Sequence, residues 1–189
     1  MLAVALLAGC GGDDDEPVAT PSPGGSPPTA STGTPAAALT PGGILPTMAS
    51  FGFRRTEPEK VAAPGGLDIA FSIYERTTEP KVQARAEVRV YANEAAARAD
   101  YPTQSEGWKT PPPDVFNTDL KNVSAPALGG MAEAVGYVAT AVDQERNRVW
   151  TDVYRIGRVV VVQHVLGRQE ADTNPIRLEL SSQIRAQVR

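Results

Sequence analysis

Residues 82–91 of this 189-residue chain, VQARAEVRVY, decide the class of fold. Apolar side chains stand at every second position of this stretch, and polar or charged ones lie between them. This alternation indicates a β-strand with one buried face. Residues 67–74, LDIAFSIY, alternate in the same way, and residues 75–81 predict a loose hairpin connection between the two strands. One-sided alternation favours an antiparallel sheet, because parallel sheets are covered on both faces.

Three further strands are predicted at residues 134–142, 149–156 and 159–166, with turns rich in polar residues or glycine between them. The run of four valines at 159–162 is apolar on both faces, which favours a central strand covered on each side. Residues 115–123 alternate only weakly and predict an edge strand.

Two helices are predicted. Asn93 is a good N-cap for the alanine-rich segment 94–100, and Pro102 is expected to end that helix. The pair Asn-Pro at 174–175 predicts the start of a terminal helix, with Asn as the cap and Pro in the first turn. Apolar residues recur at every fourth position over 176–188 and form a stripe on this helix.

The order of these elements predicts an α+β fold. Strands and helices segregate along the chain, so we expect an antiparallel sheet of about five or six strands, with two helices packed mainly on one face. The folded domain is expected to span residues 47–189, which is long enough for a single core.

A short apolar run ends at a lone cysteine near the start of the chain: Leu7, Ala8, Gly9 and Cys10. This order of aliphatic, small, small and cysteine resembles the lipobox of bacterial lipoproteins. The resemblance implies that Cys10 carries a diacylglyceryl group and further acylation of the palmitate type. It also implies that residues 1–9 are a signal peptide. Such a protein is anchored by lipid to the extracytoplasmic face of the cell membrane, because two or more acyl chains hold stably in a bilayer.

The signal peptide departs from the usual pattern in one respect. No Lys or Arg precedes Cys10, so we expect the true start codon to lie upstream of Met1. The alternative is that residues 1–9 are a chance apolar run, which is too short to span a membrane. Because Cys10 is the only cysteine, an intrachain disulfide is excluded.

Residues 10–46 are predicted to be a disordered linker. They consist mainly of Gly, Pro, Ser, Thr and Ala, which offer too little apolar surface to offset the entropy of ordering the chain. The acidic run at 13–16 lacks the glycine and distal glutamate of a calcium loop and is interpreted as a solvated spacer. We therefore expect a tether that holds the domain away from the membrane.

The charge of the predicted domain excludes one class of function. The chain has 18 basic and 22 acidic residues, and four of the acids lie in the run at 13–16, so the rest is formally neutral. Nucleic-acid-binding domains usually carry a basic field. We therefore expect no nucleic-acid partner.

Three segments carry a second resemblance: YANEAA at 91–96, LGGMAEA at 128–134 and RIGRVVVV at 155–162. Over roughly residues 50–189 the chain resembles the small globular domains of uncharacterised envelope lipoproteins. Those domains sometimes look like extracellular sensor or PsbP-like folds. The resemblance implies no catalytic residues and no cofactor.

Few residues of the chain are candidates for a catalytic or metal-binding role. His164 is the only histidine, so sites built on several His or Cys ligands are excluded, and no metal site is predicted. No Gly-x-Ser-x-Gly motif surrounds a serine, so no catalytic residue is assigned, and His164 is interpreted as a partly buried, hydrogen-bonded side chain on a strand.

Three aromatic residues and one acid give a candidate ligand or partner surface: Trp108, Trp150, Tyr154 and Asp152. The last three share one face of a predicted strand, and that face would be a polar and aromatic patch if helices cover the other face. The alternative is that Trp150 and Tyr154 belong to the core.

These observations favour a non-enzymatic lipoprotein of the cell envelope. Its domain is expected to bind a protein, a wall component or a small apolar ligand. A hydrolase acting on wall or glycan polymers is an alternative from a different class, and would require two acids, or an acid and His164, in one cleft. A sensory module that reports to a partner kinase is a further alternative.

Overall fold

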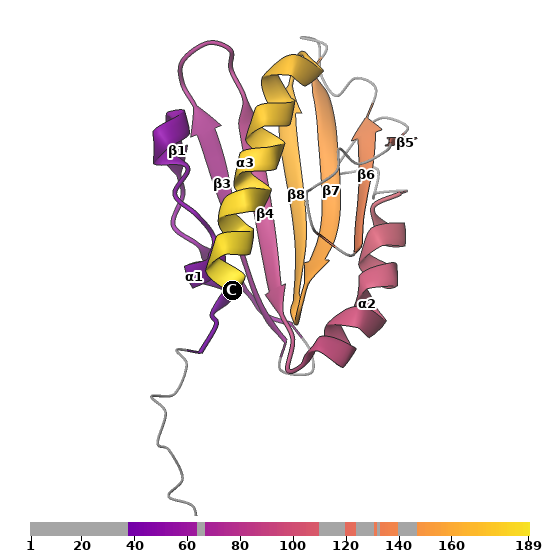
Figure 1. The fold of residues 1–189 in the computed structure, drawn as a ribbon. Coiled ribbons are helices and arrows are strands. Elements are labelled where there is room, and N and C mark those ends of the chain that lie inside the picture. Colours follow the sequence, from indigo (N-terminus) through magenta and orange to yellow (C-terminus); the bar gives the residue numbers. More distant parts are fainter. Residues whose placement is uncertain (1–37, 64–66, 110–119, 124–130, 132, 140–146) are drawn as a thin grey trace, which may run out of the picture. The chain divides into compact units, whose positions relative to one another are not determined.

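An antiparallel sheet with the strand order β1-β3-β4-β8-β7-β6-β5 carries the fold, and β2 pairs with the same strand as β1 (Figure 1). The computed structural model describes residues 38–63, 67–109, 120–123, 131, 133–139 and 147–189. The strands are β1 (Phe53–Arg55), β2 (Glu59–Val61), β3 (Asp68–Arg76), β4 (Gln83–Val90), β5 (Leu120–Val123), β6 (Glu133–Ala139), β7 (Arg148–Ile156) and β8 (Val159–Gly167). The helices are α1 (Pro41–Ile44), the 3₁₀ turn η1 (Ala49–Phe51), α2 (Glu94–Gly107) and α3 (Glu170–Val188).

The predicted α+β class and its antiparallel sheet are confirmed. The hairpin of β3 and β4 pairs Asp68 with Val90 and Glu75 with Gln83, so the alternating side chains of both strands face the same sides. Strand β8 lies between β4 and β7, as the valine run predicts. The four valines of that run are fully buried. Strands β1 and β2 extend the sheet beyond the five or six expected strands.

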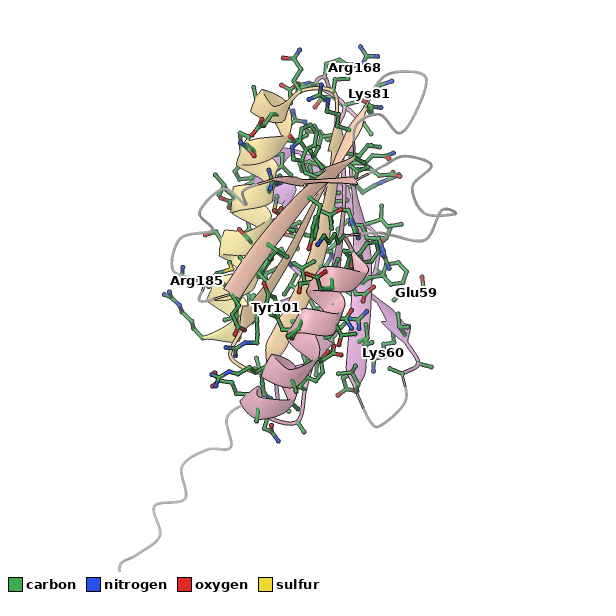
Figure 2. All side chains as sticks on the ribbon, turned by 90° about the vertical axis from the view of Figure 1, so that its right-hand side faces the viewer. Glu59, Lys60, Lys81, Tyr101, Arg168 and Arg185 are labelled. Atoms are coloured by element: carbon green, nitrogen blue, oxygen red, sulfur yellow. The ribbon has the colours of Figure 1, made fainter. Side chains whose placement is uncertain are left out.

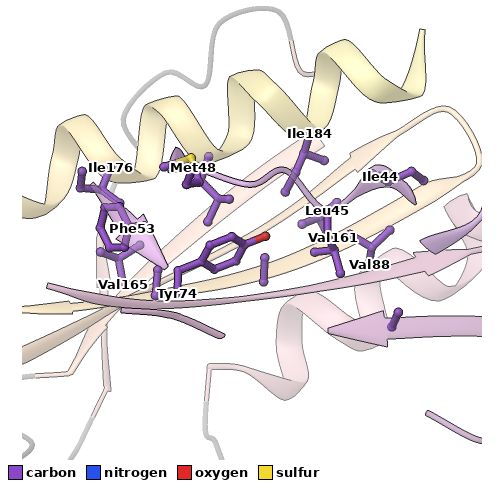
Figure 3. Close-up of a cluster of buried hydrophobic side chains, with 14 of the residues drawn as sticks. Ile44, Leu45, Met48, Phe53, Tyr74, Val88, Val161, Val165, Ile176 and Ile184 are labelled. Carbon is purple, nitrogen blue, oxygen red and sulfur yellow. The ribbon is translucent and has the colours of Figure 1, made fainter. Parts of the chain in front are cut away.

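The larger apolar core lies between one face of the sheet and α3, with α1 and η1 beside the helix (Figures 1 and 3). Helix α3 contributes Ile176, Leu180 and Ile184, which are the apolar stripe that the sequence predicts. Buried partners from the sheet and the N-terminal segment include Leu45, Met48, Phe53, Tyr74, Val88, Val161 and Val165.

The opposite face of the sheet carries a second, smaller core under α2. Ala97 and Tyr101 of this helix pack against Val153, Val160 and Val162. On β8, Val160 and Val162 alternate with valines of the larger core under α3, so the two helices lie on opposite faces of the sheet. The expectation that both helices pack mainly on one face therefore differs from the structure. The reason is that β8 is apolar on both faces and needs a cover on each.

The folded unit begins earlier than the predicted boundary at residue 47. Ile44 and Leu45 are buried in the larger core, with 1% and 3% of their surface exposed. Arg55 fixes this segment by donating hydrogen bonds to the carbonyl oxygens of Leu45, at 2.5 Å, and Pro46, at 3.4 Å. The last residues of the predicted linker are therefore part of the domain.

Both long helices run through a proline. Asn93 caps α2 as predicted, since its side chain accepts a hydrogen bond of 2.9 Å from the backbone of Ala96. The helix continues past Pro102, and its second half is held by the hydroxyl of Tyr137, which donates to the carbonyl of the buried residue Ser105 at 2.8 Å. Helix α3 begins at Glu170, before the predicted start at residue 174.

Several predictions fall partly on residues that the structure does not describe. The lipobox, the signal peptide and residues 10–37 of the linker lie outside the described residues, as do residues 115–119 and 140–142 of two predicted strands. Within the described part, no helix is long and apolar enough to cross a bilayer.

Candidate functional site

The residues predicted to form a surface patch are divided between the two faces of the sheet. Trp150, Asp152 and Tyr154 share one face of β7, as predicted, but that face lies under α3 and its adjoining core. Their exposed fractions are 3%, 0% and 0%. They therefore do not form a ligand or partner surface. Trp150 and Tyr154 are buried, which agrees with the alternative interpretation that they belong to the core.

Asp152 is the centre of a buried polar network beneath α3. Its carboxylate accepts two hydrogen bonds from the guanidinium of Arg177, at 2.5 and 2.8 Å, and one of 2.9 Å from the amide of Gln163. Gln163 in turn accepts a hydrogen bond from the hydroxyl of Tyr154 at 3.1 Å. A buried carboxylate with this many partners is saturated, so the network fixes α3 on the sheet.

Trp108, the fourth predicted surface residue, lies on the other face of the sheet. It is half-buried at the C-terminal end of α2, and its ring meets that of His164 edge-on, with 4.5 Å between the ring centres. Trp108 therefore does not join the other three residues of the predicted patch.

His164 is buried, as the sequence interpretation expects. Its Nδ1 shares a hydrogen bond of 3.0 Å with the hydroxyl of Thr151 on the neighbouring strand. Burial, and to a lesser extent the positive charge of Arg85, lower the pKa of His164 from 6.5 to about 3. The imidazole is therefore neutral at physiological pH.

The charged side chains of β4 face the same side as His164. Glu87 accepts hydrogen bonds from Arg85, at 3.1 Å, and from Arg89, at 2.9 Å. The guanidinium of Arg85 also lies over the ring of Phe71, 4.5 Å from its centre. The polar face of β4 thus carries a row of paired charges along the sheet.

A polar cleft lies at the end of the sheet where β3 turns into β4 and β8 turns into α3. Lys81 and Arg168 stand together at this end (Figure 2). The cavity has a volume of about 270 Å³, and its described lining is Glu79, Pro80, Lys81, Asn147, Arg168, Gln169 and Asp172. A second cavity of about 390 Å³ adjoins it along the β3–β4 hairpin and shares Lys81 and Asn147.

Each wall of the cleft is held in place by the fold. In the β3–β4 loop, the backbone of Lys81 donates to the carboxylate of Glu79 at 3.2 Å, and Arg76 donates to the carbonyl of Pro80 at 3.2 Å. In the opposite wall, the hydroxyl of Thr173 donates to the carbonyl of Gln169 at 3.1 Å. Neither wall depends on a ligand for these contacts.

Gly167 joins the two walls. A Cβ atom at this position would lie 2.6 Å from the methyl carbon of Thr173 and 3.7 Å from that of Val82. Thr173 and Val82 are both buried, so neither has room to move away. The first turn of α3 and the end of the β3–β4 loop therefore pack closely only because residue 167 has no side chain.

This cleft is not predicted from the sequence. Its lining comes from three separate segments, at 79–81, at 147 and at 168–172, and none of them has a motif that indicates binding. Among the described residues, no group of three or more His, Cys, Asp or Glu side chains is arranged to hold a metal ion. Cys10 and the lipobox residues Leu7, Ala8 and Gly9 lie outside the described residues.

Comparison with known proteins shows the fold. No protein-family model and no curated protein matches the chain. Among solved structures, the extracellular domain of PknH from Mycobacterium tuberculosis is similar, with a TM-score of 0.51 and 14% sequence identity. The match covers 77% of this chain and 89% of that chain. At this identity the similarity extends to the fold alone, an α+β domain with an open antiparallel sheet.

Proposed function

We propose that the protein is a lipid-anchored, non-enzymatic binding domain on the extracytoplasmic face of the cell membrane. The observation that carries the binding role is the polar cleft at the end of the sheet, whose two walls are fixed by hydrogen bonds between side chains and backbone and by the close packing at Gly167. A preformed cleft reduces the entropy cost of binding a ligand.

The placement of His164, Asp152 and Glu87 supports a binding role over catalysis, because none of them is in the described lining of the cleft. The only histidine is buried and has a pKa of about 3, so it is neutral and away from the cleft. The carboxylate of Asp152 is buried in an ion pair with Arg177, and Glu87 is paired with two arginines. Two acids, Glu79 and Asp172, do line the cleft, and each lies in the same wall as a cation. A hydrolase that uses this pair would be detected in the ligand screen below as a chemically altered ligand.

The alternative of a small apolar ligand carrier finds less support. Among the described residues, buried apolar side chains pack between the sheet and the helices on both faces. The cavities of about 270 and 390 Å³ lie outside those cores and are lined mainly by charged and amide side chains. A polar cleft favours a polar ligand.

The extracytoplasmic placement draws on two lines of support. Leu7 to Cys10 resemble a lipobox, and the fold is similar to the extracellular domain of a mycobacterial kinase. The similarity to PknH also keeps the sensory alternative open, in which a bound ligand is reported to a partner kinase. In either case the first event is binding at the domain.

Membrane fractionation tests the anchor. The full-length protein is expected in the membrane fraction and to take up a clickable fatty acid, whereas Cys10→Ala is expected in the soluble fraction without label. A Cys10→Ala protein that stays with the membrane would contradict the lipid anchor.

A ligand screen tests the binding role. The melting temperature of the full chain is measured with amino acids, short peptides, sugars and fatty acids. We expect a polar class to raise it in the wild type but not in Lys81→Gln, because ligand binding to the native state stabilises it. Recovery of the ligand is checked by mass spectrometry. A chemically altered ligand would indicate an enzyme, and a melting temperature that no class raises would contradict the binding role.

A further inference from the structure

We propose that the cleft between the β3–β4 loop and the β8–α3 turn binds a small zwitterion, a free amino acid or a dipeptide, and recognises both its ammonium and its carboxylate group. This inference rests on the proposed binding role and adds the chemical class of the ligand. The lining of the cavity carries it.

In the described lining of the cleft, the charges are balanced across its two walls. The loop contributes Glu79 and Lys81, and the turn contributes Arg168 and Asp172, so each wall presents one cation and one carboxylate. Among the described residues, the ammonium of Lys81 and the carboxylate of Asp172 have no ion-pair partner. Two opposite charges therefore line one cavity without neutralising each other.

This charge pattern discriminates between ligand classes. A purely anionic ligand would meet the carboxylates of Glu79 and Asp172, and a purely cationic ligand would meet two cations. Like charges brought together in a partly enclosed site oppose binding. A ligand that carries one charge of each sign can pair with both kinds of group, so a zwitterion fits the cleft better than either ion alone.

The size and the remaining lining of the cavity narrow the class. A volume of about 270 Å³ lies just below the roughly 300–1,000 Å³ typical of pockets for drug-sized ligands, so the ligand is small. Asn147 and Gln169 offer side-chain amides, which can both donate to and accept from a peptide group. Pro80 is the only apolar residue in the described lining, which leaves little surface for a large side chain.

Asp172 also has a structural role that the test must separate from binding. It lies in the first turn of α3 together with Glu170, where carboxylates favour the helix through its dipole. Glu170 is exposed, accepts a hydrogen bond of 3.2 Å from Asn174 and is absent from the described lining of the cleft. Glu170→Gln is therefore a matched control for Asp172→Asn, because both remove one charge from the same helix turn.

Isothermal titration of the full chain with L-alanyl-L-alanine tests the proposal. Lys81→Gln and Asp172→Asn are each expected to weaken binding by about three- to tenfold, as for loss of a partly exposed charged hydrogen bond. Glu170→Gln is expected to bind like the wild type. Lys60→Gln, an exposed lysine on β2 far from Lys81 in Figure 2, is expected to do the same.

Modified ligands show which charge meets which group. N-acetyl-L-alanyl-L-alanine lacks the ammonium, so Asp172→Asn should no longer change its affinity. L-alanyl-L-alanine amide lacks the carboxylate, so Lys81→Gln should no longer change the affinity of that compound. This cycle isolates each pairing, because two changes that remove the same interaction are not additive.

Three results would overturn the proposal. The first is the absence of binding heat at tens of millimolar dipeptide. The second is equal affinity for the dipeptide and its N-acetylated form, which would indicate a simple anion site. The third is an equal loss of affinity in Lys60→Gln and Lys81→Gln. If another ligand class stabilises the protein in a Lys81-dependent way while the dipeptide does not bind, the ligand class is wrong and the proposed binding role stands.

Discussion

The buried ion pair between Asp152 and Arg177 is predicted to hold α3 on the sheet, and Arg177→Met tests it. Met preserves most of the length of the side chain but removes the guanidinium. Of the three hydrogen bonds that Asp152 accepts, only the one from Gln163, at 2.9 Å, would remain. Removing one partner of a buried ion pair costs about 3–5 kcal/mol. That is a large part of the roughly 5–15 kcal/mol by which domains are stable.

A double variant separates the cost of an unpaired charge from the cost of lost packing. In Asp152→Leu/Arg177→Met both charges are gone, and apolar pairs of similar volume are often as stable as a buried ion pair. Gln163 loses one acceptor, which costs about 1–2 kcal/mol, but keeps its hydrogen bond of 3.1 Å to the backbone carbonyl of residue 177. We therefore expect the double variant to recover at least about 2 kcal/mol of the loss in Arg177→Met.

Urea unfolding at pH 7 measures these differences. The fluorescence of Trp150, which is buried on the same face of β7, reports the transition, and circular dichroism gives an independent probe. Arg54→Met is the control, because its ion pair with Glu75 is exposed and should be worth less than about 1 kcal/mol. A loss of less than about 1 kcal/mol in Arg177→Met would contradict this role of the ion pair. So would a double variant that loses as much stability as Arg177→Met and the single variant Asp152→Leu together.

Three further predictions concern single side chains. The pKa of His164, lowered to about 3 by burial and then by Arg85, means that the unfolded chain binds a proton below pH 6.5 that the folded chain excludes. The free energy of unfolding therefore keeps this contribution in full above pH 6.5 and loses up to about 1.4 kcal/mol for each pH unit below 6.5. In His164→Gln, the free energy of unfolding should depend less steeply on pH between pH 7 and 5. Gly167→Ala should lower the free energy of unfolding by about 1–3 kcal/mol, whereas Gly107→Ala, in a helix with open space around it, should leave it unchanged or raise it. Tyr74→Phe should raise the free energy of unfolding by about 0.5–2 kcal/mol, because the buried hydroxyl of Tyr74 has no hydrogen-bond partner among the described residues. Tyr154→Phe should lower the free energy of unfolding by about 1 kcal/mol, because it removes the hydrogen bond to Gln163.

Each of these predictions has a contrary result in the same urea titrations. Equal pH slopes for the wild type and His164→Gln would show that the imidazole does not titrate differently in the two states. Equal effects of Ala at positions 167 and 107 would contradict the close packing between the loop and α3. A loss of stability in Tyr74→Phe as large as that in Tyr154→Phe would show that the Tyr74 hydroxyl is stabilising where it lies.

The elements predicted best from the sequence are those whose signal is local. Strand β4 alternates over its whole length, and its register with β3 and β8 keeps that alternation on fixed faces. Asn93 caps α2 because the interaction requires only the three residues that follow it. The segment at 41–45 was missed because its surroundings are rich in Pro, Gly and Thr, so the burial of Ile44 and Leu45 depends on tertiary contacts alone.

The predicted surface patch was wrong because the burial of its residues depends on contacts between segments that are distant in the sequence. Alternation places Trp150, Asp152 and Tyr154 on one face, but it does not indicate what covers that face. The charge of Asp152 suggested a solvent-exposed surface. In the structure this charge is buried and neutralised by Arg177, which lies 25 residues later in the sequence. A signal was present in the sequence, since residue 177 is three positions before Leu180 and falls on the buried side of α3.

The position of the first described residues has a practical consequence. Helix α1, where the chain enters the fold, lies beside the C-terminal end of α3, and the β3–β4 loop lies at the far end of the sheet (Figure 1). Coupling at the start of α1 or at the end of α3 therefore leaves the opening between Lys81 and Arg168 unobstructed. A sensor chip or resin joined to the domain at either of these places should present every molecule with its ligand entrance facing the solvent.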